Sequence, residues 1–132
     1  MPRLHVVALS GRLPEWAEAA CAEYAKRMPK GYEVERRFIK SARFSPPRNF
    51  RVVALDEKGK DLTTEQFSTL LQQQTAFVIG GADGLDAKVK KEAALVLRLS
   101  ALTLPHALAQ VVLLEQIYRA ATLLTGHPYH RA

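Results

Sequence analysis

Short apolar segments alternate with amphipathic ones along the chain, and this alternation limits its possible folds more than any other feature. The apolar runs have the length of strands, and the stretches between them repeat apolar residues at helical spacing. Strands that alternate with helices favour a single α/β domain, with a mostly parallel sheet flanked by helices. We expect five strands, at residues 4–9, 32–39, 51–55, 76–79 and 96–99.

Helical patterns fill the intervals between these strands. Pro14 suits a first helical turn, and apolar residues then recur every four positions from Trp16 to Met28. Thr63 and Gln66 have the spacing of a capping box at the start of a short second helix. The remaining expectations are a helix capped by Asp86, a long apolar helix at 107–124 before Gly126, an extended connector at 40–49 and a turn at 56–59.

Length and composition fit one domain over residues 1–132, since 48% of the residues are hydrophobic. Charge or Pro interrupts each apolar run before it could span a membrane, so we expect no membrane contact. The N-terminus lacks a signal-peptide h-region of proper length. Cys21 is the single cysteine and cannot form an internal disulfide, which fits a reducing, cytoplasmic location. We expect Cys21 to be a small buried side chain rather than a nucleophile.

The net charge of +6 is concentrated in the first half of the chain. Between Arg36 and Arg51 there are six basic residues and no acidic one, and Phe38, Phe44 and Phe50 are interleaved with them. Such a stretch attracts a phosphate backbone through counterion release. A solubilising surface loop is the alternative, so the patch alone favours RNA only modestly.

Two segments follow predicted strands, where open α/β sheets bind ligands. Gly80 and Gly81 stand between a strand and a helix, and glycines let a backbone approach a ligand closely. Such a turn is more often only a turn. The loop at 100–106 (SALTLPH) can offer backbone groups to a flat polar ring while Leu102 and Leu104 pack on its faces. Without a comparison, a structural loop with buried leucines is the better interpretation.

The C-terminal residues crowd two histidines, a tyrosine and an arginine into the sequence GHPYHR. A histidine is a titratable base near neutral pH, and an arginine can donate to phosphate or carbonyl oxygens. A solvated tail is the alternative interpretation. The pair His127 and His130 has no carboxylates at ligand spacing, so we expect no metal site.

Taken in order, these segments resemble the bacterial large-subunit (23S) rRNA pseudouridine N3-methyltransferase family, a minimal member of the SPOUT class. The resemblance covers nearly the whole chain apart from about residues 40–50. SALTLPH and the terminal HPYHR, spaced by one helix, are highly specific in combination. The matching segments are 53–56 (VALD), 79–85 (IGGADGL), 100–106 (SALTLPH), 115–120 (EQIYRA) and 127–131 (HPYHR).

The resemblance implies a SPOUT-type fold with a C-terminal trefoil knot, an exception to unknotted topology. It also implies a homodimer that holds S-adenosyl-L-methionine in the knot, without a metal, and acts on 23S rRNA, in the assembled ribosome. The implied cofactor-binding residues are Leu55, Gly80, Gly81, Ser100, Ala101, Leu102, Thr103, Leu104 and Pro105. The implied catalytic residues, completed by the dimer partner, are His106, Tyr129, His130 and Arg131.

This chemistry suits the residues found. Methyl transfer from a sulfonium is an in-line displacement, so positioning supplies much of the acceleration. The acceptor imide nitrogen must lose a proton, which His130, His106 or a water held by either could accept. Arg131 could stabilise the uracil oxygen that gains negative charge.

The chain differs from the resembled family between the second and third strands, where a longer insertion is expected and only about residues 40–50 are present. The connector can still cross, since ten extended residues reach roughly 30 Å. Two alternatives follow: a non-catalytic or retargeted RNA- or ribosome-binding relative, and a different nucleotide-binding α/β enzyme that uses the Gly80–Gly81 turn for phosphate.

Overall fold

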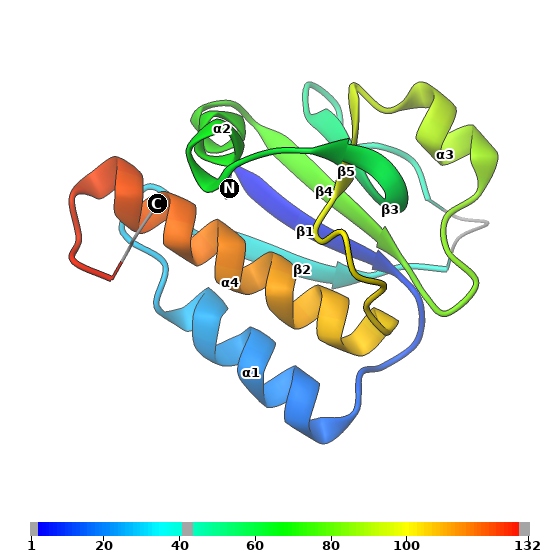
Figure 1. Cartoon of the computed structure of the whole chain (residues 1–132), viewed down its shortest axis with the longest axis horizontal. Coiled ribbons are helices and arrows are strands. Elements are labelled where there is room, and N and C mark those ends of the chain that lie inside the picture. Colours follow the sequence, from blue (N-terminus) through cyan, green and yellow to red (C-terminus); the bar gives the residue numbers. More distant parts are fainter. Residues whose placement is uncertain (1–2, 41–43, 130–132) are drawn as a thin grey trace.

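A computed structural model describes residues 3–40 and 44–129 and contains one five-stranded sheet (Figure 1). All pairings within it are parallel, and the strand order is β2-β1-β4-β3-β5. The strands are β1 (Leu4–Leu9), β2 (Val34–Phe38), β3 (Arg51–Asp61), β4 (Thr75–Gly80) and β5 (Leu95–Arg98). The α/β class and the five parallel strands expected from the sequence are confirmed. The trefoil knot stays a prediction.

The helices divide between the two faces of the sheet. Helices α1 and α4 lie side by side over one face (Figure 1), and α3 packs on the other through Val89 and Ala93. Strands β1 and β4 are buried at every residue because they are central and covered on both sides. The helical segments are α1 (Glu15–Lys26), α2 (Thr64–Ser68), the 3₁₀ turn η2 (Thr69–Gln72), α3 (Ala87–Glu92) and α4 (His106–Thr125).

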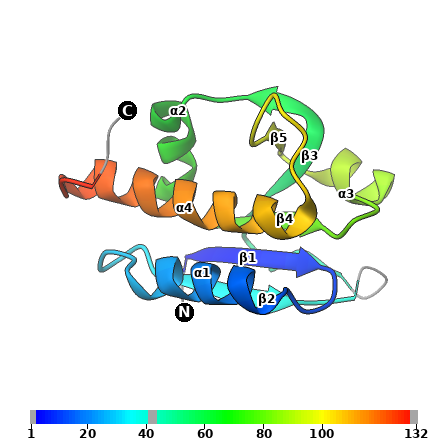
Figure 2. The ribbon, with the colours of Figure 1, turned by 60° about the horizontal axis from the view of Figure 1, so that its bottom comes forward.

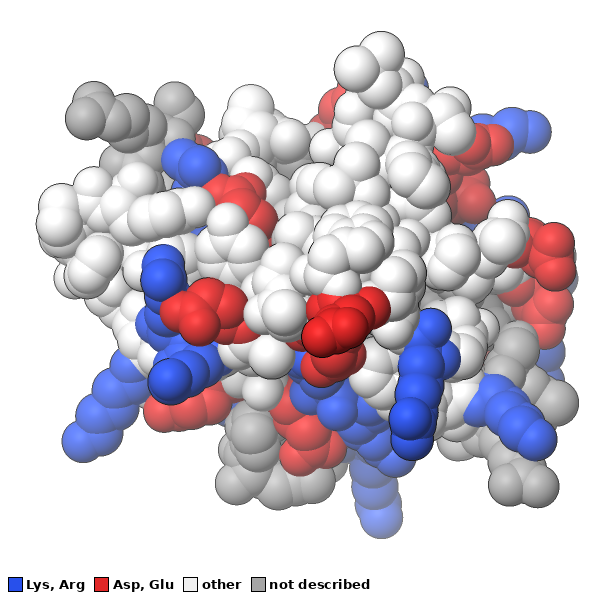
Figure 3. Space-filling model, turned by 90° about the horizontal axis from the view of Figure 1, so that it is seen from below, with Lys and Arg blue, Asp and Glu red and all other residues white. Residues whose placement is uncertain are grey.

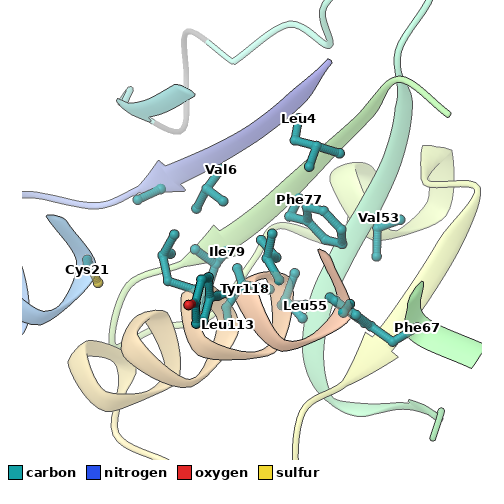
Figure 4. Close-up of a cluster of buried hydrophobic side chains, with 14 of the residues drawn as sticks. Leu4, Val6, Cys21, Val53, Leu55, Phe67, Phe77, Ile79, Leu113 and Tyr118 are labelled. Carbon is teal, nitrogen blue, oxygen red and sulfur yellow. The ribbon is translucent and has the colours of Figure 1, made fainter. Parts of the chain in front are cut away.

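The main core lies between the sheet and α4. Figure 4 shows Leu113 and Tyr118 of α4 directed toward strand residues such as Ile79 and Leu55. Phe67 of α2 stacks on Phe77 of β4, with ring centroids 5.5 Å apart. The helix sequence explains this packing, because its apolar residues recur at helical spacing and place one continuous stripe on the sheet.

Strand β3 is longer than expected. The segment 56–59, predicted to be a turn, continues the strand to Asp61 through an irregularity. Both Leu55 and Lys60 pair with Leu97 of β5, so the residues between them bulge out of the ladder. The predicted turn was wrong because pairing on both sides of the bulge outweighs the turn preference of Asp-Glu-Lys-Gly.

Helix α1 buries a different stripe from the one expected. Ala17 and Cys21 are fully buried, whereas Trp16 is 56% exposed. The prediction for Cys21 is confirmed, and burial raises the pKa of its thiol. Tyr24 and Met28 do contact the core, so the face predicted from the four-residue repeat is buried only at its C-terminal end.

The predicted helix boundaries are confirmed at several points. Thr63 and Gln66 form the capping box, in which each side chain accepts a hydrogen bond from the other residue's backbone N–H. Gly126 follows α4 in the left-handed conformation, with φ of 74°. Asp86 occupies the N-cap position of α3, but its side chain makes no capping hydrogen bond.

Fewer side chains of the basic stretch from Arg36 to Arg51 are free to contact a phosphate backbone than its sequence indicates. Arg36 makes a two-armed salt bridge to Glu18 of α1, at 2.8 and 2.9 Å. Phe44 packs against the buried side chains on the other face of the sheet, such as Val7 and Val78, and the Phe50 ring lies 4.5 Å from the buried His5 ring. Among the interleaved aromatics only Phe38 is largely exposed, because the other two anchor the connector to the sheet.

Helix α4 is long and apolar enough to cross a membrane by length and composition alone. This differs from the sequence-based expectation that every apolar run is too short. Half of its most apolar window is buried inside the fold, as in the core helix of a globular domain.

Candidate functional site

The middle of β3, at residues 55–57, and the segments that follow β4 and β5 border a pocket of about 680 Å³. A pocket of this size, with mixed apolar and polar walls, suits a small-molecule ligand. Eight of the nine predicted cofactor residues line it, as does His106. Those eight are Leu55, Gly80, Gly81, Ser100, Leu102, Thr103, Leu104 and Pro105.

The first wall is the glycine turn after β4. The N–H of Gly84 donates to the carbonyl of Gly81 at 3.0 Å, which folds the turn back on itself. A Cβ atom on Gly80 would stand 2.5 Å from the Gly84 backbone, so only glycine fits there. Gly80 therefore has a structural reason to be glycine. A Cβ atom on Gly81 would meet only Ser10, at 3.1 Å from its Cβ and 3.9 Å from its Cα.

The second wall is the loop between β5 and α4. The Leu102 N–H donates to the Ser100 hydroxyl oxygen at 2.9 Å, so a local turn shapes the loop. Leu102 is 77% exposed rather than buried, which opposes the interpretation of this loop as a structural one with buried leucines. Ala101 faces a neighbouring, smaller hollow of about 200 Å³ and does not line the main pocket.

Charged groups surround the mouth of the pocket and were not predicted as site residues. Asp56, Glu57, Asp83, Lys90 and Arg98 all line it. Lys90 pairs with Asp56 at 3.5 Å, and Arg98 pairs with Asp61 at 2.6 Å. The sequence did carry a usable pattern, since Asp56 and Asp83 follow the apolar runs of β3 and β4. Among the residues that the structure describes, no group of three His, Cys, Asp or Glu side chains is placed to hold a metal.

The predicted catalytic residues are divided between the two ends of α4. His106 is the first residue of the helix and lines the pocket, whereas Tyr129 lies beyond the helix's C-terminus. Figures 1 and 2 both place that end of α4 away from α3 and the carboxyl ends of the strands. Within one chain, His106 and Tyr129 are therefore not brought together, and His130 and Arg131 fall outside the described residues.

Tyr129 is held on the surface of α4. Its hydroxyl donates to Glu115 Oε2 at 3.0 Å, and the guanidinium of Arg119 lies 5.1 Å from its ring centroid. Its ring also meets Tyr118 edge-on at 4.6 Å. Burial and hydrogen bonds with Tyr24 and Glu115 raise the pKa of the Tyr129 hydroxyl. At its start, at least, the tail is therefore docked rather than solvated.

Residues 3–130 match the model of a protein family described as "Predicted SPOUT methyltransferase". The chain belongs to the SPOUT methyltransferase family. A SPOUT relative from Paraburkholderia phymatum, named Ribosomal RNA large subunit methyltransferase H, is 44% identical over 98% of this chain and 99% of its own length. A protein of the same name from Polynucleobacter asymbioticus is 45% identical, with the same coverage.

Solved structures of SPOUT-type enzymes share the fold of this SPOUT chain. A probable methylase family protein from Haemophilus influenzae gives a TM-score of 0.65 at 10% identity, covering 99% of this chain and 71% of that one. The SpoU methyltransferase AviRb from Streptomyces viridochromogenes, solved in complex with the cofactor AdoMet, gives 0.56 at 14% identity, covering 97% and 58%. At such low identity these likenesses show the fold alone.

Proposed function

We propose that this SPOUT methyltransferase transfers a methyl group from S-adenosyl-L-methionine to N3 of a pseudouridine in 23S rRNA. The single observation that carries the proposal is the pocket. The glycine turn after β4 and the SALTLPH loop after β5 both line it, and these two strands lie on either side of β3. The named relatives, which match almost end to end, support rRNA of the large subunit as the substrate class. Such an enzyme would work beside ribosomes in the cytoplasm.

The pocket lining fits the cofactor. Leu55, Ile79 and Leu85 supply apolar surface for an adenine ring, and the exposed loop residues can offer backbone donors and acceptors. The carboxylates of Glu57 and Asp83 at the mouth favour a ligand that carries positive charge. S-adenosyl-L-methionine, when bound, supplies an electrophilic methyl group on a sulfonium.

The chain's own residues then have three tasks. The pocket walls hold the donor and exclude water, so that the acceptor nitrogen can approach in line. That nitrogen gains a carbon and loses its proton, and we assign the proton to His106 or His130, directly or through a water. Arg131 is the group proposed to face the uracil oxygen as its negative charge grows.

The separation of the catalytic candidates supports a site shared between two subunits. From Arg119, where Tyr129 docks, to His106 the helix rises about 20 Å, and even from Glu115 it rises about 13 Å. Arg131 is two positions after Tyr129 in the sequence, a backbone reach of about 7 Å. Arg131 can thus serve the pocket of a partner more easily than its own.

The exposed side of α4 is a suitable dimer surface. Leu114 and Ile117 are buried within one chain, but Leu108, Val111, Val112 and Leu123 are only partly covered. Figure 3 shows a broad uncharged area, with charged side chains gathered around it. A two-fold axis across α4 would set the helices antiparallel, placing the tail of each subunit beside the partner's His106.

Two experiments test this function. Ribosomal RNA from cells with and without the protein is compared by mass spectrometry, and one N3-methylpseudouridine should be lost without it. An unchanged rRNA would remove the proposed substrate. Purified protein with labelled S-adenosyl-L-methionine is then assayed on intact ribosomes and on free rRNA. Cofactor binding without methylation of either would favour the non-catalytic alternative.

Mixing subunits tests the shared site. His106→Ala and Arg131→Ala chains, each inactive alone, are co-expressed with different tags. If tails act across the dimer, the mixture should recover about a quarter of wild-type turnover, since half the dimers are mixed and each has one intact site. Mixed dimers without activity would place the tail at its own pocket, and light scattering that finds only monomers would exclude the dimer.

A further inference from the structure

We infer that Tyr129 is not a catalytic residue but an anchor, held by Glu115 and Arg119, that positions the residues after it for the reaction. This inference rests on the proposed function for its effect on turnover. Its structural part, the anchor itself, stands independently. It departs from the resemblance-based assignment of Tyr129 to the group of catalytic residues.

The anchor is built from side chains on one face of α4. Glu115 and Arg119 are one helical turn apart. The Nε of Arg119 donates to Glu115 Oε2 at 2.9 Å, and an Nη of Arg119 forms an ion pair with the same oxygen at 2.8 Å. Gln116 donates to the other carboxylate oxygen at 2.7 Å. The carboxylate is therefore fixed in orientation before Tyr129 reaches it, and the hydrogen bond from the Tyr129 hydroxyl completes its shell.

The ring of Tyr129 is fixed as well as its hydroxyl. Arg119 lies over the ring face, and Tyr118 meets the ring edge-on, with Tyr24 behind it at 5.8 Å. Cation–π and edge-to-face contacts each stabilise the ring's position beyond what burial of its apolar surface contributes. A hydroxyl bound to a carboxylate and a ring held on two sides leave Tyr129 no freedom to follow a substrate.

The backbone leading to Tyr129 is shaped for this docking. Gly126 takes the left-handed conformation, and the N–H of His127 donates to the Thr122 carbonyl at 2.9 Å, which ends the helix and reverses the chain. Tyr129, three positions after Gly126, reaches back to Glu115, which is fourteen positions earlier in the sequence. The chain reversal at Gly126 and the contacts of Tyr129 together fix the position at which the chain continues to residue 130.

An anchor and an acid–base catalyst differ in what the hydroxyl is needed for. Tyr129→Phe keeps both ring contacts and loses the hydroxyl's hydrogen bonds with Glu115 and Tyr24, so the anchor predicts a loss in kcat of roughly tenfold. Tyr129→Ala removes every contact and should lose at least about a hundredfold, as expected when several coupled contacts go together. KM for ribosomes and the affinity for S-adenosyl-L-methionine should stay near wild type, because the pocket is elsewhere.

The matched pair at Glu115 separates positioning from general destabilisation. Glu115→Gln keeps an acceptor for the Tyr129 hydroxyl and should retain most of the activity, whereas Glu115→Ala should resemble Tyr129→Phe or be slower. The Glu115→Ala effect should shrink in the Tyr129→Phe background, because the two residues act through one bond. Equal, severe losses in Tyr129→Phe and Tyr129→Ala would instead make the hydroxyl catalytic and overturn the inference.

A second measurement does not depend on activity. The chain has four tyrosines, so each ¹⁹F resonance of 3-fluorotyrosine-labelled protein can be assigned with single Phe variants. In Glu115→Ala the Tyr129 resonance should shift toward the position of an unfolded-chain tyrosine, and in Glu115→Gln it should shift much less. An unmoved resonance in Glu115→Ala would show that no anchor exists. Wild-type protein that fails to methylate ribosomes, with the resonance moving as expected, would count against the proposed function and leave the anchor standing.

Discussion

Gly59 lies directly against the backbone of Leu97, and a Cβ atom on it would stand 2.6 Å from the Leu97 carbonyl carbon. This contact lets the bulge of β3 close over β5, with Leu55 and Lys60 pairing on either side. The same bulge places Asp56 and Glu57 in the lining of the pocket. The glycine is therefore required by a close approach of two backbones.

Gly59→Ala should lower the free energy of unfolding by about 1–3 kcal/mol, because neither backbone can yield without disturbing the β3–β5 pairing. Cofactor affinity should fall with it, since the bulge carries part of the pocket wall. Urea unfolding and calorimetry measure both. Gly11→Ala is the matched control: nothing lies within 4 Å of its Cβ position, so its stability should stay within about 0.5 kcal/mol of wild type. Equal stabilities of the two variants would contradict the account of the bulge.

Gly81→Ala should weaken S-adenosyl-L-methionine binding by about tenfold or more, equivalent to about 1.4 kcal/mol. The added methyl group meets only the Ser10 side chain at 3.1 Å, so the protein should remain folded. Valine is a poorer choice, because its extra methyl groups would crowd Ser10 further. The double variant Ser10→Gly/Gly81→Ala relieves the crowding. If it binds the cofactor normally, the loss came from Ser10 and Gly81 does not contact the ligand.

The salt bridge between Glu18 and Arg36 should make stability depend on acid pH. The hydrogen bond from Arg36 holds the pKa of the Glu18 carboxyl below its ordinary 4.5. Because the folded-state pKa is the lower one, the contribution is fully present above pH 4.5 and is lost as pH falls through the folded-state pKa. The difference in unfolding free energy between wild type and Glu18→Gln should therefore shrink below pH 4.5. A difference that stays constant down to pH 3 would exclude this bridge as its cause.

Charge reversal at Arg37, Lys40 and Arg48 should raise KM for ribosomes and flatten its salt dependence, while leaving cofactor affinity unchanged. These three side chains are the exposed cations of the basic stretch among the residues described. A matched reversal at Lys26 and Arg27, exposed near the C-terminal end of α1, controls for net charge. Equal effects from both sets would mean that the connector is not a specific RNA contact.

The sheet could be predicted because its strands are short apolar runs of the right length. The residues of β1 and β4 read as buried strands in sequence and are buried in the structure. The 56–59 turn failed because local preference carries no information about β5, forty residues later. Trp16 failed for a similar reason: a four-residue repeat fits either of two adjacent helix faces, and packing on α4 and the sheet selects Ala17 and Cys21.

The residues that line the pocket could largely be predicted from the sequence, but their arrangement could not. Strand ends identified Leu55, Gly81 and the SALTLPH loop, and the structure brings them to one pocket. The sequence could not show that Gly80 must be glycine because of the nearby Gly84 backbone, whereas Gly81 has no such close backbone contact. Nor could it show Tyr129 docked on Glu115, since the pair is joined only by the reversal at Gly126. Removing residues 129–132 should therefore cost some stability, contrary to the expectation for a solvated tail.

The strand order also matters while the protein is being synthesised. Strand β1 is made first, yet one of its two neighbours, β4, is complete only after residue 80 has left the ribosome. Until then the apolar run LHVVAL has an open edge that another nascent chain could pair with. The chain's excess positive charge lies in its first 60 residues, so it accumulates during this interval and is complete before β4 is made. Repulsion between two chains that carry this charge opposes pairing at the open edge.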